Sequence, residues 1–392
     1  MNLFPTDSHE LWPQIRSAIC HKYDVVLWID LCRMDMDMPR LYKQLESFSN
    51  FEFAPNQRIV IYHIDTDYYI NSHTPGFTLW NVFKLCSALN VPTEYTYFIS
   101  SQPGIEKELS ALAQEFNMPN MQTVFCPYQL CPSPNQVNTL DLNAHQVRHP
   151  YVCMNGQVRE HRMYTLCQLD YQEILDRGMV SLWPNLQEVF DNTQPTVHQH
   201  YDIIPTELGI HLRTTAKFTR INDRLILNQQ QREIFHSKRS LLYRTIKHND
   251  IDNTPNHNGS RTDFGFLQKA LWNLVTETVG EYPYPWLTEK TFKAVLTKRP
   301  FILVSSKDSL KRIQDHGFKT FNPWINESYD QYTTVSDRID YAVKELLPFC
   351  KMSDQQLQQF LLEISSVLEY NFNHYVENFG KTDVDYFIEN VL

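Results

Sequence analysis

The sequence predicts an α/β protein made of two domains, and three observations support that fold class. The chain has 392 residues, which is enough for two domains of ordinary size with a core each. Short apolar runs rich in β-branched residues alternate with segments of helical spacing, as in parallel sheets whose strands are joined by helices. A polar stretch rich in Pro and Asn, residues 131–149, separates two such regions. We therefore expect one domain at residues 1–140 and a second at 150–392.

The first domain is expected to hold a doubly wound, Rossmann-like sheet. In chain order the pattern predicts strands at 24–29 and 58–63, a helix at 77–89, a strand at 95–100, a helix at 104–116 and a strand at 122–126. The glycine-rich dinucleotide fingerprint and the GxxxxGKS/T phosphate loop are both missing from the sequence. These absences argue against NAD or FAD binding and against the commonest class of ATP or GTP hydrolase.

The second domain is expected to alternate strands and helices around an irregular insertion. The pattern predicts a strand at 151–154, a turn at 155–157, a helix at 160–175 closed by Gly178, and an extended segment at 179–182. Between about 185 and 262, Gln- and Asn-rich runs predict an irregular insertion with a mobile loop near 249–262. Beyond it we expect a helix at 264–278, a helix opened by Thr288, a strand at 300–304 and one or two helices within 353–378.

Composition and charge exclude several classes of function. The chain contains 23 Phe, 21 Tyr and 7 Trp but only 10 Gly, which indicates a packed globular protein. A formal net charge of −10 argues against general nucleic-acid binding, which needs a positive field. Eight cysteines without a CxxC pair argue against a zinc site, and we expect no metal. Without a signal peptide or an apolar run of roughly 18 residues, we expect a cytoplasmic protein with no membrane span.

The triplet Thr288-Glu289-Lys290 marks a candidate site. Thr288 is a good N-cap, Glu289 carries negative charge where a helix N-terminus favours it, and an apolar strand follows the helix. Helix N-termini beside such strands are where α/β proteins hold phosphorylated ligands. The alternative is a solvated first turn of no further significance.

Two blocks of sequence carry a resemblance to a known family. The first is residues 154–162, MNGQVREHR, which combines an Asn-containing turn with a helix bearing arginine. The second comprises LVTET at 274–278, WLTEKTF at 286–292 and RPFILV at 299–304. In order and spacing these resemble the nucleotide-sugar-binding half of the α1,3-fucosyltransferases and of their uncharacterised viral and bacterial relatives.

The resemblance implies a fold, a ligand and a set of residues. The fold is GT-B, two Rossmann-like domains facing each other across a cleft, and the C-terminal domain binds a nucleotide-sugar, usually GDP-fucose, without a metal or a prosthetic group. The acceptor is a glycan or another hydroxyl compound, and the oligomeric state stays open. By resemblance, Arg162 and Lys290 lie near the diphosphate, and Glu289 lies near the sugar or ribose. Glu277 binds hydroxyls or orients Lys290. The binding set is Asn155, Arg162, Glu277, Thr288, Glu289 and Lys290.

The chain departs from the family pattern beside this set. Thr278 stands where the family usually carries asparagine, and the following loop, 279–285, holds Glu281 between Gly280 and two Pro-flanked tyrosines. Sugar transfer also needs a general base, which the resemblance does not locate. Asp65 and Asp67 follow the strand at 58–63, at the edge where α/β sheets bind ligands, although aspartates also favour turns.

Two functions follow from these observations. The first is an inverting, metal-independent glycosyltransferase with Asp65, Asp67 and Glu289 as candidate catalytic carboxylates. The second is a non-catalytic GT-B-like protein, virion-associated or carbohydrate-binding. Arg162 fits a phosphate site and a solvated helix surface equally well, and we interpret His161 beside it as a surface or structural residue and not a catalytic one.

Overall fold

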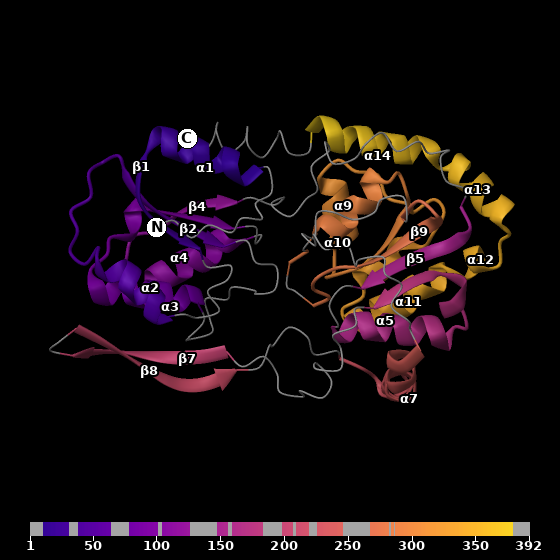
Figure 1. The fold of residues 1–392 in the computed structure, drawn as a ribbon, viewed down its shortest axis with the longest axis horizontal. Coiled ribbons are helices and arrows are strands. Elements are labelled where there is room, and N and C mark those ends of the chain that lie inside the picture. Colours follow the sequence, from indigo (N-terminus) through magenta and orange to yellow (C-terminus); the bar gives the residue numbers. More distant parts are fainter. Residues whose placement is uncertain are drawn as a thin grey trace. The chain divides into compact units, whose positions relative to one another are not determined.

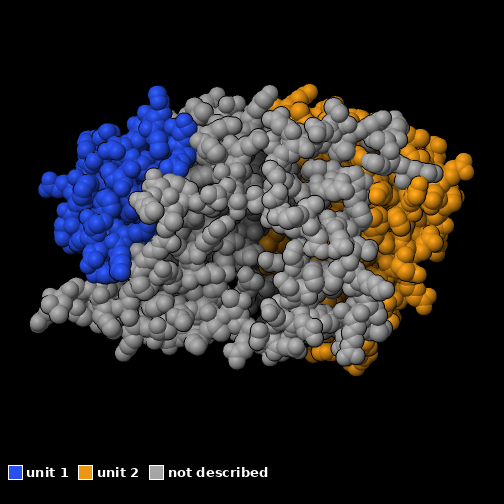
Figure 2. Space-filling model, viewed as in Figure 1, with its two compact units in different colours: residues 1–129, 194–220, 381–392 blue, residues 130–193, 221–380 orange. Residues whose placement is uncertain are grey.

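The protein divides into two compact units (Figure 2). Unit 1 comprises Met1–Gln129, Gln194–Arg220 and Lys381–Leu392, and unit 2 comprises Leu130–Thr193 and Ile221–Gly380. The computed structural model describes residues 11–30, 38–63, 78–100, 104–125, 147–155, 159–182, 198–206, 209–218, 226–245, 267–281, 284–285 and 287–378. The predicted boundaries at 140 and 150 and the predicted cleft stay predictions.

Unit 1 is built on a four-stranded parallel sheet with strand order β1-β2-β3-β4. The strands are β1 (Asp24–Asp30), β2 (Gln57–His63), β3 (Thr96–Ser100) and β4 (Gln122–Phe125) (Figure 1). The helices of this region are α1 (Leu11–Lys22), α2 (Met38–Glu46), α3 (Thr78–Leu89), the 3-10 turn η1 (Thr93–Tyr95) and α4 (Ile105–Glu115). The strands and helices predicted for this region are thereby confirmed.

Apolar side chains of the sheet and of the helices packed on it form the core of unit 1. Ile59 and Ile61 of β2 and Phe98 of β3 are buried together with Phe83 of α3 and Leu112 of α4. All five residues of β3 are buried, as in a parallel strand covered on both faces.

The segment expected to be an irregular insertion holds regular structure. Strands β7 (His198–Thr206) and β8 (Gly209–Phe218) form an antiparallel hairpin that belongs to unit 1. Helix α7 (Gln229–Thr245) follows in unit 2. The prediction of irregular structure is therefore wrong for these residues, because Gln-rich and Asn-rich composition does not by itself prevent strand pairing or helix formation. The loop predicted near 249–262 lies outside the described residues.

Unit 2 contains a second four-stranded parallel sheet, with strand order β10-β9-β5-β6. Its strands are β5 (His149–Asn155), β6 (Met179–Leu182), β9 (Ala270–Thr276) and β10 (Phe301–Val304). The chain first moves from β5 to β6, and then returns to the other side of β5 as β9 before continuing outward to β10. The strand order therefore reverses between β5 and β9. In open α/β sheets ligands bind outside the carboxyl ends of the strands at this point.

Strand β9 corrects the helix predicted at 264–278. All seven residues from Ala270 to Thr276 are buried, and β9 pairs with both β5 and β10. Trp272 is fully buried, with its ring centroid 5.5 Å from that of Phe321 and 5.1 Å from that of Phe349. An apolar run of this length fits a buried helix as well as a buried strand, and pairing on both sides decides it.

The helices of unit 2 pack around its sheet, with α7 lying against α5 (Figure 1). They are α5 (Glu160–Tyr171), η3 (Leu175–Arg177), α7, α9 (Glu289–Leu296), α10 (Ser309–Asp315), η5 (Glu327–Gln331), α11 (Val335–Glu345), α12 (Leu347–Cys350), α13 (Asp354–Glu363) and α14 (Ser365–Asn378). Helix α5 packs against α7 and α11, while α9 packs against α14. The helix predicted to open at Thr288 and the helices predicted within 353–378 are confirmed.

Helix α5 ends earlier than the sequence predicts. Glu173 has a positive φ of 58°, and the N–H of Ile174 donates to the carbonyl of Leu169 at 3.0 Å, so the chain reverses there. Gly178 is therefore not the residue that closes the helix. A Cβ at this position would clash with the ring of Tyr151, and close packing accounts for the glycine.

Asp330 makes the stability of unit 2 depend on pH. Its carboxylate accepts hydrogen bonds from the N–H groups of Ser309 (3.2 Å) and Leu310 (3.0 Å) at the start of α10. Burial nevertheless raises its pKa from 3.8 to about 6. Between these values the folded protein binds more protons than the unfolded chain, so the contribution to stability is full below about pH 4 and is lost as pH rises through 6. The free energy of unfolding of the wild type should therefore fall, relative to that of Asp330→Asn, by up to about 3 kcal/mol between pH 4 and 7.

Urea titrations of both proteins at a series of pH values measure this difference. A difference between wild type and Asp330→Asn that stays constant from pH 4 to 7 would contradict the prediction.

Candidate functional site

The carboxyl ends of β5 and β9 meet at the reversal of strand order. Asn155 ends β5 and Thr276 ends β9, and the Thr276 hydroxyl donates to Asn155 Oδ1 at 2.8 Å. Asn155 Nδ2 donates to the carbonyl of Ser181 in β6 at 3.3 Å. The side chain of Asn155, only 2% exposed, thus joins the ends of three strands and gives this edge of the sheet a fixed shape.

Glu277 follows β9 directly, and its buried carboxylate gathers four donors of the protein. Oε1 accepts from the N–H of Thr288 (3.0 Å) and from the hydroxyl of Thr291 (2.6 Å). Oε2 accepts from the N–H of Thr278 (3.1 Å) and from the hydroxyl of Thr288. Since a carboxylate offers about four acceptor positions, these bonds use its capacity and place a negative charge at the N-terminus of α9.

The backbone of Glu277 is held as firmly as its side chain. Its N–H donates to the carbonyl of Val304 at 2.9 Å, while its own carbonyl accepts from Arg162 Nη2 at 3.1 Å and contacts His161 Nε2 at 2.9 Å. Burial, together with the nearby charge of Arg162, lowers the pKa of His161 well below its usual range. The imidazole is therefore neutral near pH 7, and this contact requires its proton on Nε2.

The N-terminus of α9 contributes the lysine of the site. Thr288 caps the helix, since its side chain accepts from the N–H of Lys290, as predicted. Lys290 Nζ donates to Thr278 Oγ1 (2.9 Å), to Thr288 Oγ1 (3.4 Å) and to Glu289 Oε1 (2.8 Å). The lysine side chain remains 26% exposed, and that of Glu289 remains 17% exposed.

Glu289 is ionised at neutral pH. Burial alone would raise its pKa, but the charges of Lys290 and Lys293 and hydrogen bonds with Lys290 and Thr288 outweigh burial and lower the pKa to about 2. The site thus combines two cations, Arg162 and Lys290, with two carboxylates, those of Glu277 and of the ionised Glu289.

The structure brings six of the predicted residues to one edge of the unit 2 sheet. Hydrogen bonds connect Glu277 to Arg162 and Thr288, and Thr288 to Lys290, with Asn155 one bond from the end of β9. Arg162 is buried, which excludes the alternative of a solvated helix surface, and His161 is also buried, with a structural contact in place of a surface position. Asp65 and Asp67 lie outside the described residues. The roles assigned to these side chains stay predictions.

Sequence reasoning missed the hydroxyl side chains that build this arrangement. Thr276, Thr278 and Thr291 each make a hydrogen bond to a predicted site residue. Their positions in the sequence were the available signal. Thr276 and Thr278 flank Glu277 in the run VTET, and Thr291 extends the TEK triplet to TEKT.

Comparisons with known proteins give likenesses of fold at low identity. No family model and no curated protein matches the chain. Among solved structures, that of trehalose-6-phosphate from E. coli bound with UDP-2-fluoro glucose is similar at 11% identity and a TM-score of 0.42, with 95% of this chain and 78% of that chain covered. The N-terminal domain of Candida albicans trehalose-6-phosphate phosphatase is similar at 10% identity and a TM-score of 0.41, with 91% and 75% covered. Similarity at this level establishes no family.

Two further findings bear on the kind of site. Within the described residues, no group of three or more His, Cys, Asp or Glu side chains could hold a metal ion. In the same part of the chain, no helix combines the length and apolar character needed to cross a bilayer.

Proposed function

We propose that the carboxyl edge of the unit 2 sheet binds the diphosphate of a nucleotide-sugar, and that the protein is a metal-independent glycosyltransferase of GT-B type. The observation that carries this proposal is the convergence of Arg162, Lys290 and the N-terminus of α9 on the reversal of strand order between β5 and β9. Anions bind where helix N–H groups and cations meet outside parallel strands. The resemblance of the surrounding sequence to the fucosyltransferases favours a GDP-sugar of the fucose type as the donor.

The chemistry follows from the charges on the leaving group. An acceptor hydroxyl attacks the anomeric carbon, the bond from that carbon to the diphosphate oxygen breaks, and the hydroxyl proton passes to a carboxylate base. Direct displacement inverts the configuration at the anomeric carbon. The departing diphosphate gains negative charge, which Lys290, Arg162 and the N-terminus of α9 would stabilise. Asp65 and Asp67 remain the proposed bases, and Glu289 would contact the sugar or ribose.

One observation favours the alternative of a non-catalytic, carbohydrate-binding protein. Lys290 already donates to three acceptors of the protein, and one of them is the ionised Glu289. A phosphate would have to displace Thr278 or Glu289 from the ammonium group. A protein that no longer transfers sugars could keep these bonds for stability alone.

Thermal stability in the presence of nucleotides tests the proposal. A ligand that binds only the folded state stabilises it by RT ln(1 + [L]/Kd), about 2.7 kcal/mol at one hundred times Kd. We expect GDP to raise the melting temperature of the wild type more than UDP or CDP does, and we expect Lys290→Ala to abolish the shift. Lys311→Ala is the matched control, because Lys311 lies on the exposed face of α10 in an ion pair with Asp315.

The outcomes separate the two functions. If none of the three nucleotides or their sugars changes the melting temperature, the binding proposal fails. If GDP stabilises the protein but GDP-fucose is neither hydrolysed nor transferred to an acceptor, the non-catalytic alternative is correct. An equal shift in Lys290→Ala and wild type would place the nucleotide elsewhere.

A further inference from the structure

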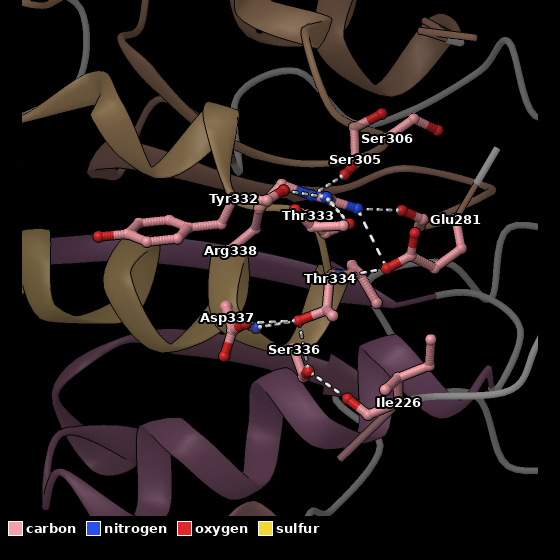
Figure 3. Close-up of polar contacts among 12 residues, drawn as sticks. Ile226, Glu281, Ser305, Ser306, Tyr332, Thr333, Thr334, Ser336, Asp337 and Arg338 are labelled. Atoms are coloured by element: carbon pink, nitrogen blue, oxygen red, sulfur yellow. Dashed lines mark hydrogen bonds and ion pairs between the residues drawn. The ribbon is translucent and has the colours of Figure 1, made fainter. Parts of the chain in front are cut away.

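Arg338 of α11 is a buried cation directed at the segment that follows Glu277. Its side chain is 1% exposed, and its guanidinium donates from all three nitrogens (Figure 3). Nε donates to the carbonyl of Ser305 at 2.9 Å, and Nη1 to the carbonyls of Tyr332 (2.6 Å) and Thr333 (3.1 Å). Nη2 donates to the carbonyl of Gly280 at 2.7 Å. One side chain thus ties the end of β10 and the start of α11 to the loop after β9.

Glu281 strengthens the same connection from the loop side. Its Oε1 lies 3.3 Å from Arg338 Nη2 (Figure 3). The same oxygen accepts a hydrogen bond from the N–H of Val335, the first residue of α11. The carboxylate therefore lies at the N-terminus of a helix, where negative charge is favoured. The side chain of Glu281 is 30% exposed, so solvent reaches one side of this pair.

Gly280 is confined between α11 and α5. A Cβ at this position would lie 2.8 Å from Val335 Cγ2 and 3.1 Å from His161 Cγ. His161 in turn contacts the carbonyl of Glu277. Contacts from α5, α9, α11 and β10 thus fix both ends of the five residues 277–281, which we call the 277–281 segment.

The 277–281 segment carries an acceptor for the lysine of the candidate site. Thr278 Oγ1 accepts from Lys290 Nζ at 2.9 Å, and its N–H is fixed on Glu277 Oε2 at 3.1 Å. A displacement of the segment therefore moves the ammonium group at the N-terminus of α9. Binding sites depend on supporting residues of this kind, because an error of about 1 Å in position can cost on the order of 100-fold in function.

We propose that Arg338 and Glu281 are positioning residues, which hold the 277–281 segment so that Thr278 keeps Lys290 at the phosphate-binding end of α9. This inference rests on the proposed function for its ligand, but the contacts of Arg338 and Glu281 with the 277–281 segment are present in the protein without ligand. It also gives a role to Glu281, which stands in the loop where this sequence departs from the fucosyltransferase pattern.

Two measurements on the full chain test the proposal. The first is amide hydrogen exchange of the 277–281 segment without ligand, in the wild type, Glu281→Ala, Glu281→Gln and Arg338→Lys. The second is the Kd of GDP by titration calorimetry for the same proteins. We expect faster exchange and roughly 10- to 100-fold weaker GDP binding in Glu281→Ala and Arg338→Lys, by analogy with the loss seen when residues that orient the ligands of a metal are removed. Glu281→Gln, which keeps an acceptor for Val335 and Arg338, should restore most of both losses.

The matched control is Glu369→Ala. Glu369 forms an ion pair with Lys298 at 2.7 Å and is 41% exposed, so its removal also breaks a glutamate–cation pair in unit 2. Neither exchange of the 277–281 segment nor the Kd should change in this variant. Urea unfolding of Glu281→Ala should stay close to that of the wild type, which separates positioning from loss of the fold and covers the case in which Arg338→Lys does not fold.

The results distinguish failure of this inference from failure of the proposed function. If amide hydrogen exchange of the 277–281 segment is unchanged in Glu281→Ala, the positioning role of Glu281 is overturned, whether or not GDP binds. Faster exchange with an unchanged Kd for GDP overturns the link from the segment to Lys290 and leaves nucleotide binding intact. A wild type that binds no GDP overturns the proposed function and the ligand part of this inference together.

Discussion

Replacing Glu277 with alanine is expected to lower the free energy of unfolding of unit 2 by about 3–5 kcal/mol. The buried carboxylate accepts from two N–H groups and two hydroxyls, those of Thr278, Thr288 and Thr291. Without it these donors stay buried and lose their acceptor, and each unsatisfied donor costs about 1–3 kcal/mol. The negative charge at the N-terminus of α9 is lost as well.

Urea-induced unfolding followed by circular dichroism measures this loss. Glu369→Ala is again the comparison, since its partly exposed ion pair should contribute no more than about 1 kcal/mol. A loss below 1 kcal/mol in Glu277→Ala would mean that water replaces the carboxylate, and the four-donor arrangement would then not stabilise the site. GDP binding should weaken in the same variant, because Thr288 loses the contact that fixes its hydroxyl.

Replacing Trp272 with alanine should cost about 3–5 kcal/mol in the same measurement. Trp272 is fully buried in the central strand β9, where its ring packs edge-on against Phe321 and Phe349. Truncation leaves a cavity that these rings cannot fill without moving, and the penalty adds to the lost transfer free energy. Trp272→Phe should recover more than half of the loss.

Trp324 provides the matched control for this substitution. Its indole N–H donates to Glu363 at 2.9 Å in a solvent-exposed contact. Trp324→Ala should therefore cost much less than Trp272→Ala. Equal costs at the two positions would show that β9 does not carry the core of unit 2.

The parallel strands of unit 1 could be predicted because the residue pattern that indicates a strand lies within each strand itself. β2, for example, is a run of apolar β-branched residues with polar residues on both sides, and that pattern needs no partner to be recognised. β9 shows where such reasoning stops. Its run ALWNLVT suits a buried helix or a buried strand, and only pairing with β5 and β10, distant in sequence, decides between them.

The candidate site also combines features that local sequence predicts with features that depend on residues distant in the chain. The N-cap Thr288 was predictable, because capping is a local property of the residue and of the helix after it. The binding of Arg162 and His161 to the carbonyl of Glu277 was not, since the donors come from a helix 115 and 116 residues upstream. A backbone acceptor also carries no signature in the sequence. The partners of Arg338 were hidden for this reason, since four of them are carbonyl groups.

The hairpin of β7 and β8 has a consequence for how the chain acquires its structure during synthesis. It belongs to unit 1, yet it is encoded after β5, α5 and β6 of unit 2. Domains usually fold as they emerge from the ribosome, the N-terminal one first. Here the hairpin of unit 1 is synthesised only after part of unit 2 has been translated. Strand β9, with which β5 pairs, is synthesised later still. The two units are therefore completed in alternation, and no single cut in the chain yields either one whole.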